Sequence, residues 1–451
     1  MSTSLFNEFD TTSAAAWKQK IQVDLKGADY NETLLWKTDE GITVKPFYTK
    51  EDRTNSIVQV PKKGFNICQS VFIDDEKIAN FLAVDALKRG ANAIQFLAKT
   101  AFDYKTILQN IDFQNTIIYF KLQFLSADFV LEISKFINSK NVYFQIDTIG
   151  NLATTGNWFS TLKEDQIALK KIVKNIPNSI SVDVSLYENA GATSVQQLAY
   201  ALAHANEYLH VFGKEIAKKI HFIFSVKSNY FFEIAKLRAF RVLWKTLLSE
   251  YNIDQKNVHI FTQPSLRNKT LYDYNVNMLR TTSECMSAIL GGSNTISNVS
   301  YDAVYHKSNE FGERISRNQL LILQQESGLE NAQHIAEGAY YIESITKQLA
   351  EKALIIFKQI ENGGGFLKQL KEGVIQRKIN ESVTKEQQSF DKNELLLLGT
   401  NFLPNKNDKM SENLEIYPFV KQQNHKTLIS PILKRRLSES LEKKQLDLEK
   451  K

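Results

Sequence analysis

Hydrophobic positions along this chain form short runs that alternate with longer segments of helical periodicity. Eight runs are rich in β-branched or aromatic residues and have the length of buried strands. They lie at residues 65–72, 93–97, 116–120, 142–147, 180–186, 220–226, 258–262 and 294–298. Between most of them apolar residues recur on one helical face, in segments 76–89, 127–138, 162–175, 194–212 and 231–249. Strands that alternate with helices predict βαβ units with right-handed crossovers.

Eight such units in succession predict an α/β fold, a (β/α)8 TIM barrel. The connection after the second strand is the weakest, because residues 102–110 offer only a short helix. We expect three regions. Residues 1–60 form an amino-terminal arm, with a short helix and a strand-like segment, that contacts a partner subunit; residues 61–330 form the barrel; and residues 331–451 form helices that pack on the barrel and close it.

Polar residues occupy alternate positions on several of the predicted strands. Among them are Gln145 and Asp147 on the fourth strand, Asp183 on the fifth, His221 on the sixth and Asn294 on the eighth. Alternate residues of a barrel strand face the interior, so these groups are candidates to line it. Two alternatives remain open: a barrel threaded by a ligand, or polar groups that bond to one another or to trapped water.

Composition narrows the class of protein. Apolar residues make up 43% of the 451 residues, yet none of the apolar runs approaches the roughly 18 residues that span a bilayer. The net charge of +6 is dispersed along the chain, which argues against a nucleic-acid partner and suits an anionic metabolite. The first residues lack the features of a signal peptide, and only Cys68 and Cys285 could form a disulfide. We therefore expect a reduced, cytoplasmic protein without a membrane anchor.

The segment from Arg280 to Tyr341 carries a family resemblance. It contains Arg280-Thr-Thr-Ser-Glu284, Leu290-Gly-Gly-Ser-Asn294 and Arg314-Ile-Ser-Arg-Asn318. With residues 190–209 and 231–244, it resembles the barrel domain of the adenosylcobalamin-dependent acyl-CoA mutases, methylmalonyl-CoA mutase in particular. Residues 24–29 and 40–44 are similar to the small subunit of the heterodimeric form. The resemblance extends over about residues 10–450 and implies a subunit of a radical isomerase.

Departures from the family pattern bear on catalysis. Catalytic members carry a Tyr-His pair before an Ala-Gly-Ala turn, and its imidazole bonds the migrating carbonyl. Aligned on Ala190-Gly-Ala192, that pair becomes Ser185 and Leu186, and leucine can neither donate nor accept. The family's glutamine after the Gly-Gly turn becomes Asn294, which is one methylene shorter. The resemblance thus implies that this chain keeps the barrel and lacks catalytic residues.

The cofactor is expected to lie elsewhere. In the family a separate domain with an Asp-x-His-x-x-Gly motif binds cobalamin, and none of the seven histidines fits that motif. Residues 433–437 with Leu441 look like the family's barrel-closing helix, after which few residues remain. We therefore expect this chain to bind neither cofactor nor metal, and the complete enzyme to use adenosylcobalamin held by its partner.

Other chemistry was weighed against structural roles. Asp147 and Asp183 could pair as in barrel hydrolases, and His221 with His259 could form a ligand or acid/base pair. Core or rim positions, with structural bonds, are the favoured interpretation of all four. Residues 362–365, Asn-Gly-Gly-Gly, are interpreted as a helix C-cap in preference to a phosphate loop.

The leading hypothesis is a non-catalytic small subunit of a heterodimeric methylmalonyl-CoA mutase. Its partner would be the large catalytic subunit, which would handle the CoA ester. One alternative is a self-sufficient TIM-barrel enzyme that acts on a CoA ester or a small anion through Asp147, Asp183 or His221. Another is a catalytic mutase that works with a separate cobalamin protein.

Overall fold

The core of the molecule is an eight-stranded parallel barrel, which confirms the predicted fold class. A computed structural model describes residues 8–53, 58–61, 64–254, 257–332, 334–420 and 425–449. The strands follow the order β6-β5-β4-β3-β10-β9-β8-β7. Their bounds are β3 (Asn66–Phe72), β4 (Ala93–Ala98), β5 (Ile117–Leu122), β6 (Val142–Phe144), β7 (Ile180–Asp183), β8 (Ile220–Val226), β9 (Ile260–Pro264) and β10 (Thr295–Ile296). All eight strands lie where the sequence predicts them.

The barrel closes between β6 and β7, the two ends of that order. Phe144 N donates to Asn178 O at 3.0 Å, and Ser181 N donates to Ile146 O at 2.9 Å. These two backbone bonds replace a regular ladder, because β6 ends after three residues. This seam is therefore the least regular part of the wall.

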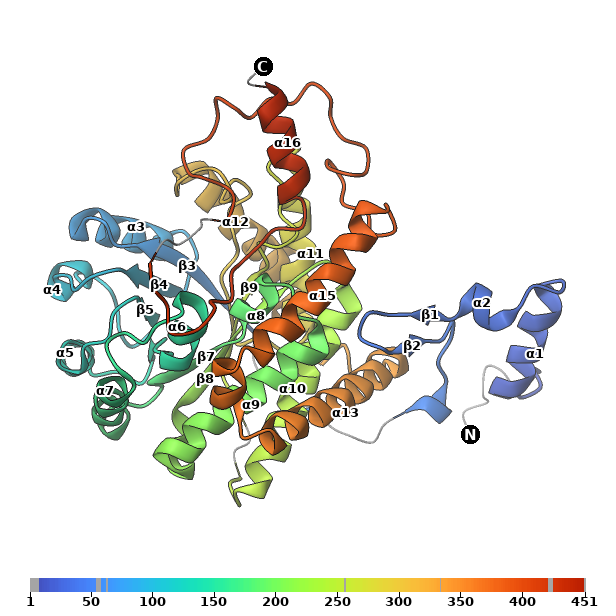
Figure 1. Ribbon diagram of the computed structural model, residues 1–451, viewed down its shortest axis with the longest axis horizontal. Helices are drawn as coiled ribbons and strands as arrows, with labels where there is room; N and C mark the ends of the chain where they lie inside the picture. Colours follow the sequence, from blue (N-terminus) through green and yellow to red (C-terminus); the bar gives the residue numbers. More distant parts are fainter. Residues whose placement is uncertain are drawn as a thin grey trace.

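Helices surround the barrel in the predicted alternation (Figure 1). They are α3 (Glu76–Lys88), α4 (Tyr104–Ile107), α5 (Ala127–Ile137), α6 (Thr148–Thr155), α7 (Leu162–Asn175), α8 (Ser185–Asn189), α9 (Ser194–Phe212), α10 (Tyr230–Glu250), α11 (Val276–Leu290) and α12 (Glu310–Leu321), with short turns η2 (Lys214–Lys219), η3 (Ile322–Glu326) and η4 (Leu329–Asn331). Local signals set their ends: Thr193 and Gln196 form a capping box at α9, and Gly292, with φ +85°, follows α11. The strand predicted over residues 180–186 is too long, since Ser185 and Leu186 begin α8.

The carboxy-terminal helices form a further layer on the barrel. They are α13 (Tyr340–Asn362), α14 (Phe366–Lys371), α15 (Val374–Asp391) and α16 (Glu439–Glu449). Gly373 takes φ +73° and separates α14 from α15. The polar segment 380–391 is helical because Ile375 and Ile379 bury one face of α15. As predicted, the glycines at 363–365 cap α13, and Gly365 N donates to Ile360 O at 3.1 Å.

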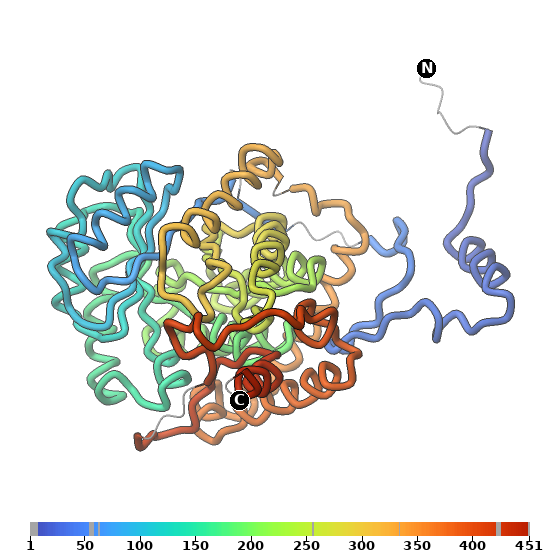
Figure 2. The backbone as a smooth tube through the Cα atoms, turned by 90° about the horizontal axis from the view of Figure 1, so that it is seen from above, coloured from blue at the N-terminus to red at the C-terminus, as the bar shows by residue number. Residues whose placement is uncertain are grey.

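The amino-terminal arm, residues 8–53, extends to one side of the barrel (Figures 1 and 2). It consists of α1 (Ala14–Asp24), α2 (Tyr30–Leu34), a hairpin of β1 (Trp36–Lys37) and β2 (Thr43–Val44), and η1 (Lys50–Asp52). The hairpin is anchored: Glu40 accepts hydrogen bonds from Ser194 N at 2.7 Å and Val195 N at 2.8 Å, at the amino end of α9. By contrast, α1 has no buried residue.

A single large hydrophobic cluster joins the barrel to the carboxy-terminal helices and to the base of the arm. It runs from Ile42 and Val44 through the barrel strands to Ile345 in α13 and Ile432. Boundaries at residues 60 and 330 stay a prediction. Among the described residues, no helix has both the length and the apolar character that a membrane crossing requires.

Candidate functional site in the barrel

The centre of the barrel is filled by side chains. Cys68, Ala93, Tyr119, Ile223 and Phe261 form a separate hydrophobic cluster, and each is at most 4% exposed. The ring of Tyr119 lies 4.9 Å from that of Phe261, edge to face, and 5.1 Å from the stacked ring of Tyr143. The bulk at this level leaves the lumen packed like a protein core.

A buried histidine, His221, and a half-buried one, His259, flank this aromatic cluster. Tyr119 OH donates to Thr295 Oγ1 at 2.7 Å and lies 2.7 Å from His259 Nε2, which therefore donates to it. Neither ring nitrogen of His221 has a hydrogen-bond partner among the residues that the structure describes. Burial lowers the pKa of His221 to about 3 and that of His259 well below its ordinary value. Both imidazoles are neutral at physiological pH and do not act as an acid/base pair there.

The described residues contain no group of three or more His, Cys, Asp or Glu side chains placed to hold a metal ion. His221 and His259 lie within the packed lumen, and His204, fully buried, is hydrogen-bonded through both nitrogens. Cys68 and Cys285 are free and buried.

Asp147 holds the barrel seam together. As the N-cap of α6 it accepts through Oδ1 from Gly150 N at 2.7 Å, Tyr208 OH at 2.7 Å and His204 Nε2 at 2.9 Å. Its Oδ2 accepts from Asp183 N at 2.8 Å, across the gap between β6 and β7. Four scaffold donors thus occupy this carboxylate, which gives it a structural role.

Asp183 stands beside Asp147 at the carboxyl end of β7. Lys121 Nζ, from β5, lies 2.9 Å from Asp183 Oδ2, and Ser185 N donates to Oδ1 at 3.1 Å. Burial raises the pKa of Asp183, but the charges of Lys121 and Lys434 outweigh that effect, so the pKa lies below its ordinary value. Asp183 is therefore an ionised acceptor, and both Asp183 and Asp147 are already engaged.

Leu186 forms part of the wall of the barrel mouth. It is 1% exposed on α8, directly after β7, and lines a cavity of about 390 Å³ together with Asp183, Ile223 and Lys434. Its neighbour Ser185 donates its hydroxyl to Asp183. The position that resembles the family's carbonyl-binding histidine is therefore apolar and buried.

The structure separates Asn294 from the other candidate residues. Asn294 precedes β10, at the amino end of the strand, where its Oδ1 accepts from Arg241 Nη2 at 3.0 Å and from Ile260 N at 2.9 Å. Arg241 belongs to the outer helix α10. Gln145 and Asp183, by contrast, line the cavity at the carboxyl ends of the strands.

A carboxy-terminal strap, residues 428–437, crosses the barrel mouth. Ile432 N donates to Ala153 O at 2.7 Å, Arg435 N to Asn189 O at 2.9 Å and Leu437 N to Arg267 O at 2.8 Å. The helix expected over residues 433–437 with Leu441 was wrong. The strap is not helical, because its backbone bonds to α6, α8 and the loop at Arg267, and α16 begins only at Glu439.

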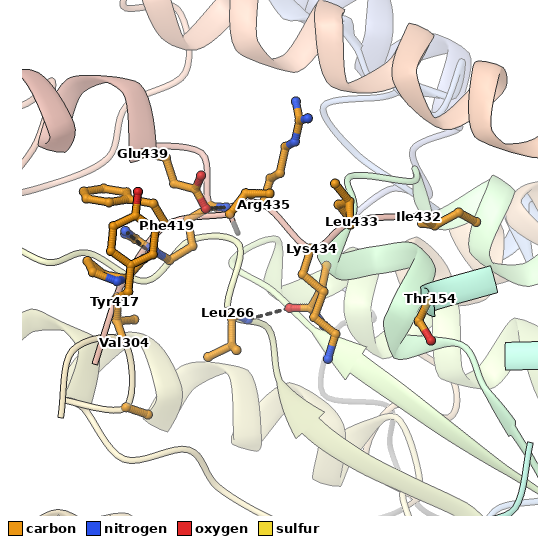
Figure 3. A pocket seen from close by; sticks show the side chains of 15 residues that line it. Thr154, Leu266, Val304, Tyr417, Phe419, Ile432, Leu433, Lys434, Arg435 and Glu439 are labelled. Carbon is orange, nitrogen blue, oxygen red and sulfur yellow. Dashed lines mark hydrogen bonds between the residues drawn. The ribbon is translucent and has the colours of Figure 1, made fainter. Parts of the chain in front are cut away.

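Side chains of the strap leave it in opposite directions (Figure 3). Arg435 points away from the barrel, whereas Lys434 points toward the strands and lines the mouth cavity. A second cavity, of about 370 Å³, lies along the strap and is lined by Leu266, Tyr417 and Phe419 among others. The strap thus forms the outer wall of both cavities.

Sequence reasoning missed three residues of this site. Lys121 shares an inward face with Tyr119, two residues earlier, so period-two alternation on the third strand was a usable signal. His204 lies on a helix face that contacts the seam, but its partner Asp147 is distant in sequence. No local signal places Lys434 in the mouth, because that depends on the path of the strap.

Comparison with known proteins agrees with this architecture. Residues 137–450 match the family described as methylmalonyl-CoA mutase. The methylmalonyl-CoA mutase small subunit of Porphyromonas gingivalis is 32% identical over 442 residues, which cover 89% of this chain and 71% of that protein. Rhizobium meliloti methylmalonyl-CoA mutase is 35% identical over 257 residues, which cover 54% of this chain and 36% of the relative. The large subunit of the Propionibacterium freudenreichii enzyme is 32% identical over 239 residues, covering 50% and 33%.

The chain covers only part of the length of some of these relatives. This chain spans about a third of the Rhizobium meliloti protein and of the Propionibacterium large subunit. The family match nevertheless extends from the short strand β6 to the last helix, and it includes the seam, the mouth and the strap. With its eight-stranded barrel, the chain belongs to the methylmalonyl-CoA mutase family.

Proposed function

We propose that this chain is the non-catalytic small subunit of a heterodimeric, adenosylcobalamin-dependent methylmalonyl-CoA mutase. Its role would be to support a large catalytic subunit that interconverts methylmalonyl-CoA and succinyl-CoA. The observation that carries the proposal is the buried Leu186 at the position where the family resemblance calls for a histidine. A side chain without donor or acceptor atoms cannot polarise a thioester carbonyl.

The packed lumen supports the same proposal. A CoA arm that reached the mouth through the barrel would have to pass Tyr119 and Phe261, both fully buried. The similarity to the Porphyromonas gingivalis small subunit, over most of this chain, points in the same direction. The partner would hold adenosylcobalamin and the CoA ester, and a cytoplasmic location stays a prediction.

The arm supplies a means of association. Phe9 is 72% exposed, Trp17 50% and Val23 71%, although apolar side chains of this size gain free energy when buried. The hairpin at the base of the arm is tied to α9 through Glu40, so α1 is held away from the barrel. An obligate interface that included the arm would bury more than about 2,000 Å² in total.

A self-sufficient barrel enzyme remains the second candidate function, and the geometry gives it less support. It would need Asp147, Asp183 or His221 as an acid or base. Asp147 accepts four hydrogen bonds, Asp183 is bonded to Lys121 and Ser185, and His221 is sealed within the lumen.

The proposal is tested by purifying the chain alone and together with the large mutase subunit of the same organism. We expect a one-to-one complex in size-exclusion chromatography with light scattering, and turnover of methylmalonyl-CoA only when the large subunit and adenosylcobalamin are present. Turnover by this chain alone, abolished by Asp183→Asn, would establish the second candidate instead. Absence of a complex would refute the subunit role.

A further inference from the structure

The floor of the mouth cavity contains hydrogen-bond donors that no described residue satisfies. Gln145 and Ser181, which are 4% and 1% exposed, both line the cavity. Gln145 Oε1 accepts from Gln95 Nε2 at 2.6 Å, but Gln145 Nε2 and Ser181 Oγ have no hydrogen-bond partner in the described parts of the chain. Leaving a buried donor unpaired costs about 1–3 kcal/mol, and most buried polar atoms in proteins avoid that cost. Two such donors on one cavity point to an acceptor that occupies it.

The upper wall of the cavity adds positive charge. Lys121 extends from β5 and Lys434 from the strap. Lys121 is paired with Asp183 at 2.9 Å. The exposed Lys434 acts on Asp183 through its charge, but it forms no hydrogen bond or ion pair within 4.0 Å among the described residues. The carboxylates that face the cavity, Asp147 and Asp183, have donors on all their oxygens. Among the described residues, the groups on this cavity that lack a hydrogen-bond partner are therefore the Lys434 ammonium and two neutral donors.

The remaining walls are apolar. Leu186, Ile223 and Phe159 line the same cavity, whose volume of about 390 Å³ falls within the range of about 300–1,000 Å³ typical of small-molecule sites. Donors on the floor and on the strap, with hydrocarbon between them, suit an anion that has a short apolar body. Inorganic phosphate has no such body and would leave these walls without a contact.

We infer that the mouth of this barrel binds a small aliphatic carboxylate. The carboxylate accepts hydrogen bonds from Ser181, Gln145 and Lys434, and the hydrocarbon part lies against Leu186 and Ile223. Because Lys434 belongs to the strap, the bound anion also fastens the strap to the barrel. The inference goes beyond the proposed function and holds whether or not a partner subunit is present.

The test uses the full chain and sodium butyrate, with butyramide as its uncharged isostere and inorganic phosphate as a second anion. Binding is followed by saturation-transfer NMR of the ligand at constant ionic strength, with dissociation constants from the concentration dependence. We expect butyrate to bind at millimolar concentration and both butyramide and phosphate to bind at least about tenfold more weakly, the effect of one lost charged hydrogen bond.

Two variants locate the site. Ser181→Ala removes a hydroxyl that has no partner, so the unliganded protein should melt at the wild-type temperature while butyrate affinity falls about tenfold. Lys434→Gln should also weaken butyrate about tenfold. Arg435→Gln, the neighbouring strap position with the same change of charge, points away from the cavity and should leave affinity unchanged.

Three outcomes would overturn the inference. They are no saturation transfer to butyrate, equal binding of butyrate and butyramide, and unchanged affinity in both Ser181→Ala and Lys434→Gln. The first would mean that the unpaired donors hold only water. Failure of the subunit role appears in a different measurement, the size of the complex, so the two proposals can fail independently.

Discussion

The barrel interior and the amino-terminal arm differ in which side chains they bury. In the barrel, polar groups such as Asp147 and His204 are buried and find partners within the chain. In the arm, apolar side chains such as Trp17 and Val23 are exposed and have few packing partners. Contacts within the chain therefore account for the stability of the barrel, whereas the exposed apolar surface of the arm can be buried only by another molecule. This difference distinguishes the barrel, which is stabilised by its own core, from the arm, which we expect to contact a partner.

The largest expected effect is at a buried ion pair of the barrel. Lys269 Nζ lies 2.8 Å from Glu284 Oε2, and the side chains are 2% and 1% exposed. Lys269→Met should lower the free energy of unfolding by about 3–5 kcal/mol, because it leaves a buried carboxylate without its cation. Urea denaturation measures the change. The same substitution in the arm, Lys20→Met, breaks an exposed pair with Asp24 and should cost less than about 1 kcal/mol. Similar losses at both sites would contradict the comparison.

Truncating the arm's exposed indole should affect assembly and spare folding. Trp17→Ala should weaken binding to the large subunit by about 2 kcal/mol, or about 30-fold, as expected for an interface aromatic. The melting temperature of the isolated chain should not change, because Trp17 is half exposed. Calorimetric titration against the large subunit measures the affinity.

A matched control is Phe81→Ala on α3, at the side of the molecule opposite the arm, where the ring is 69% exposed. It should leave the affinity unaltered. An equal loss in both variants would mean that exposed aromatic surface in general, and not the arm, governs association.

A smaller effect is expected from removing one hydroxyl in the lumen. Tyr119→Phe leaves His259 Nε2 and Thr295 Oγ1 without their shared partner and should cost about 1–3 kcal/mol. Tyr143→Phe keeps the stacked ring and removes a hydroxyl that bonds to none of the described residues. It should cost less than about 0.5 kcal/mol. Chemical denaturation measures the free energy of unfolding of both variants. A larger loss in Tyr143→Phe than in Tyr119→Phe would show that the hydrogen bonds of Tyr119 do not stabilise the lumen.

The effect that is smallest at neutral pH, and that grows as the pH falls, is the contribution of His221. In the folded chain the pKa of His221 lies at about 3, against an ordinary value of 6.5, so between these values the unfolded chain binds more protons. Stability should therefore fall as the pH drops below about 6.5, by at most about 1.4 kcal/mol per pH unit for this residue. His221→Phe should remove that contribution, with no pH-dependent difference above pH 7.5. Parallel curves for the two proteins between pH 5 and 7.5 would refute it.

Much of the fold was predictable because its signals are local. Period-two and helical spacing located all eight strands, and α7 and α9 begin and end as predicted. Predictions were wrong where tertiary contacts override the local pattern. Leu186 leaves the strand to join α8, and the strap is not helical because its backbone bonds to α6, α8 and the loop at Arg267. Of the residues that the polar alternation grouped together, Gln145, Asp147 and Asp183 line the mouth cavity, whereas Asn294 lies at the amino end of its strand.

The amino-acid sequence alone determined the barrel and, through its motifs, the family, because periodicity and turn residues act within a few positions of the chain. Only the tertiary structure decided that Asp147 closes the seam, that Tyr119 and Phe261 fill the lumen, and that Lys434 reaches the mouth. Each of these depends on which strand ends and loops meet in space. Hydrogen bonds and charges act over a few ångströms, and only the folded chain brings their partners within that distance.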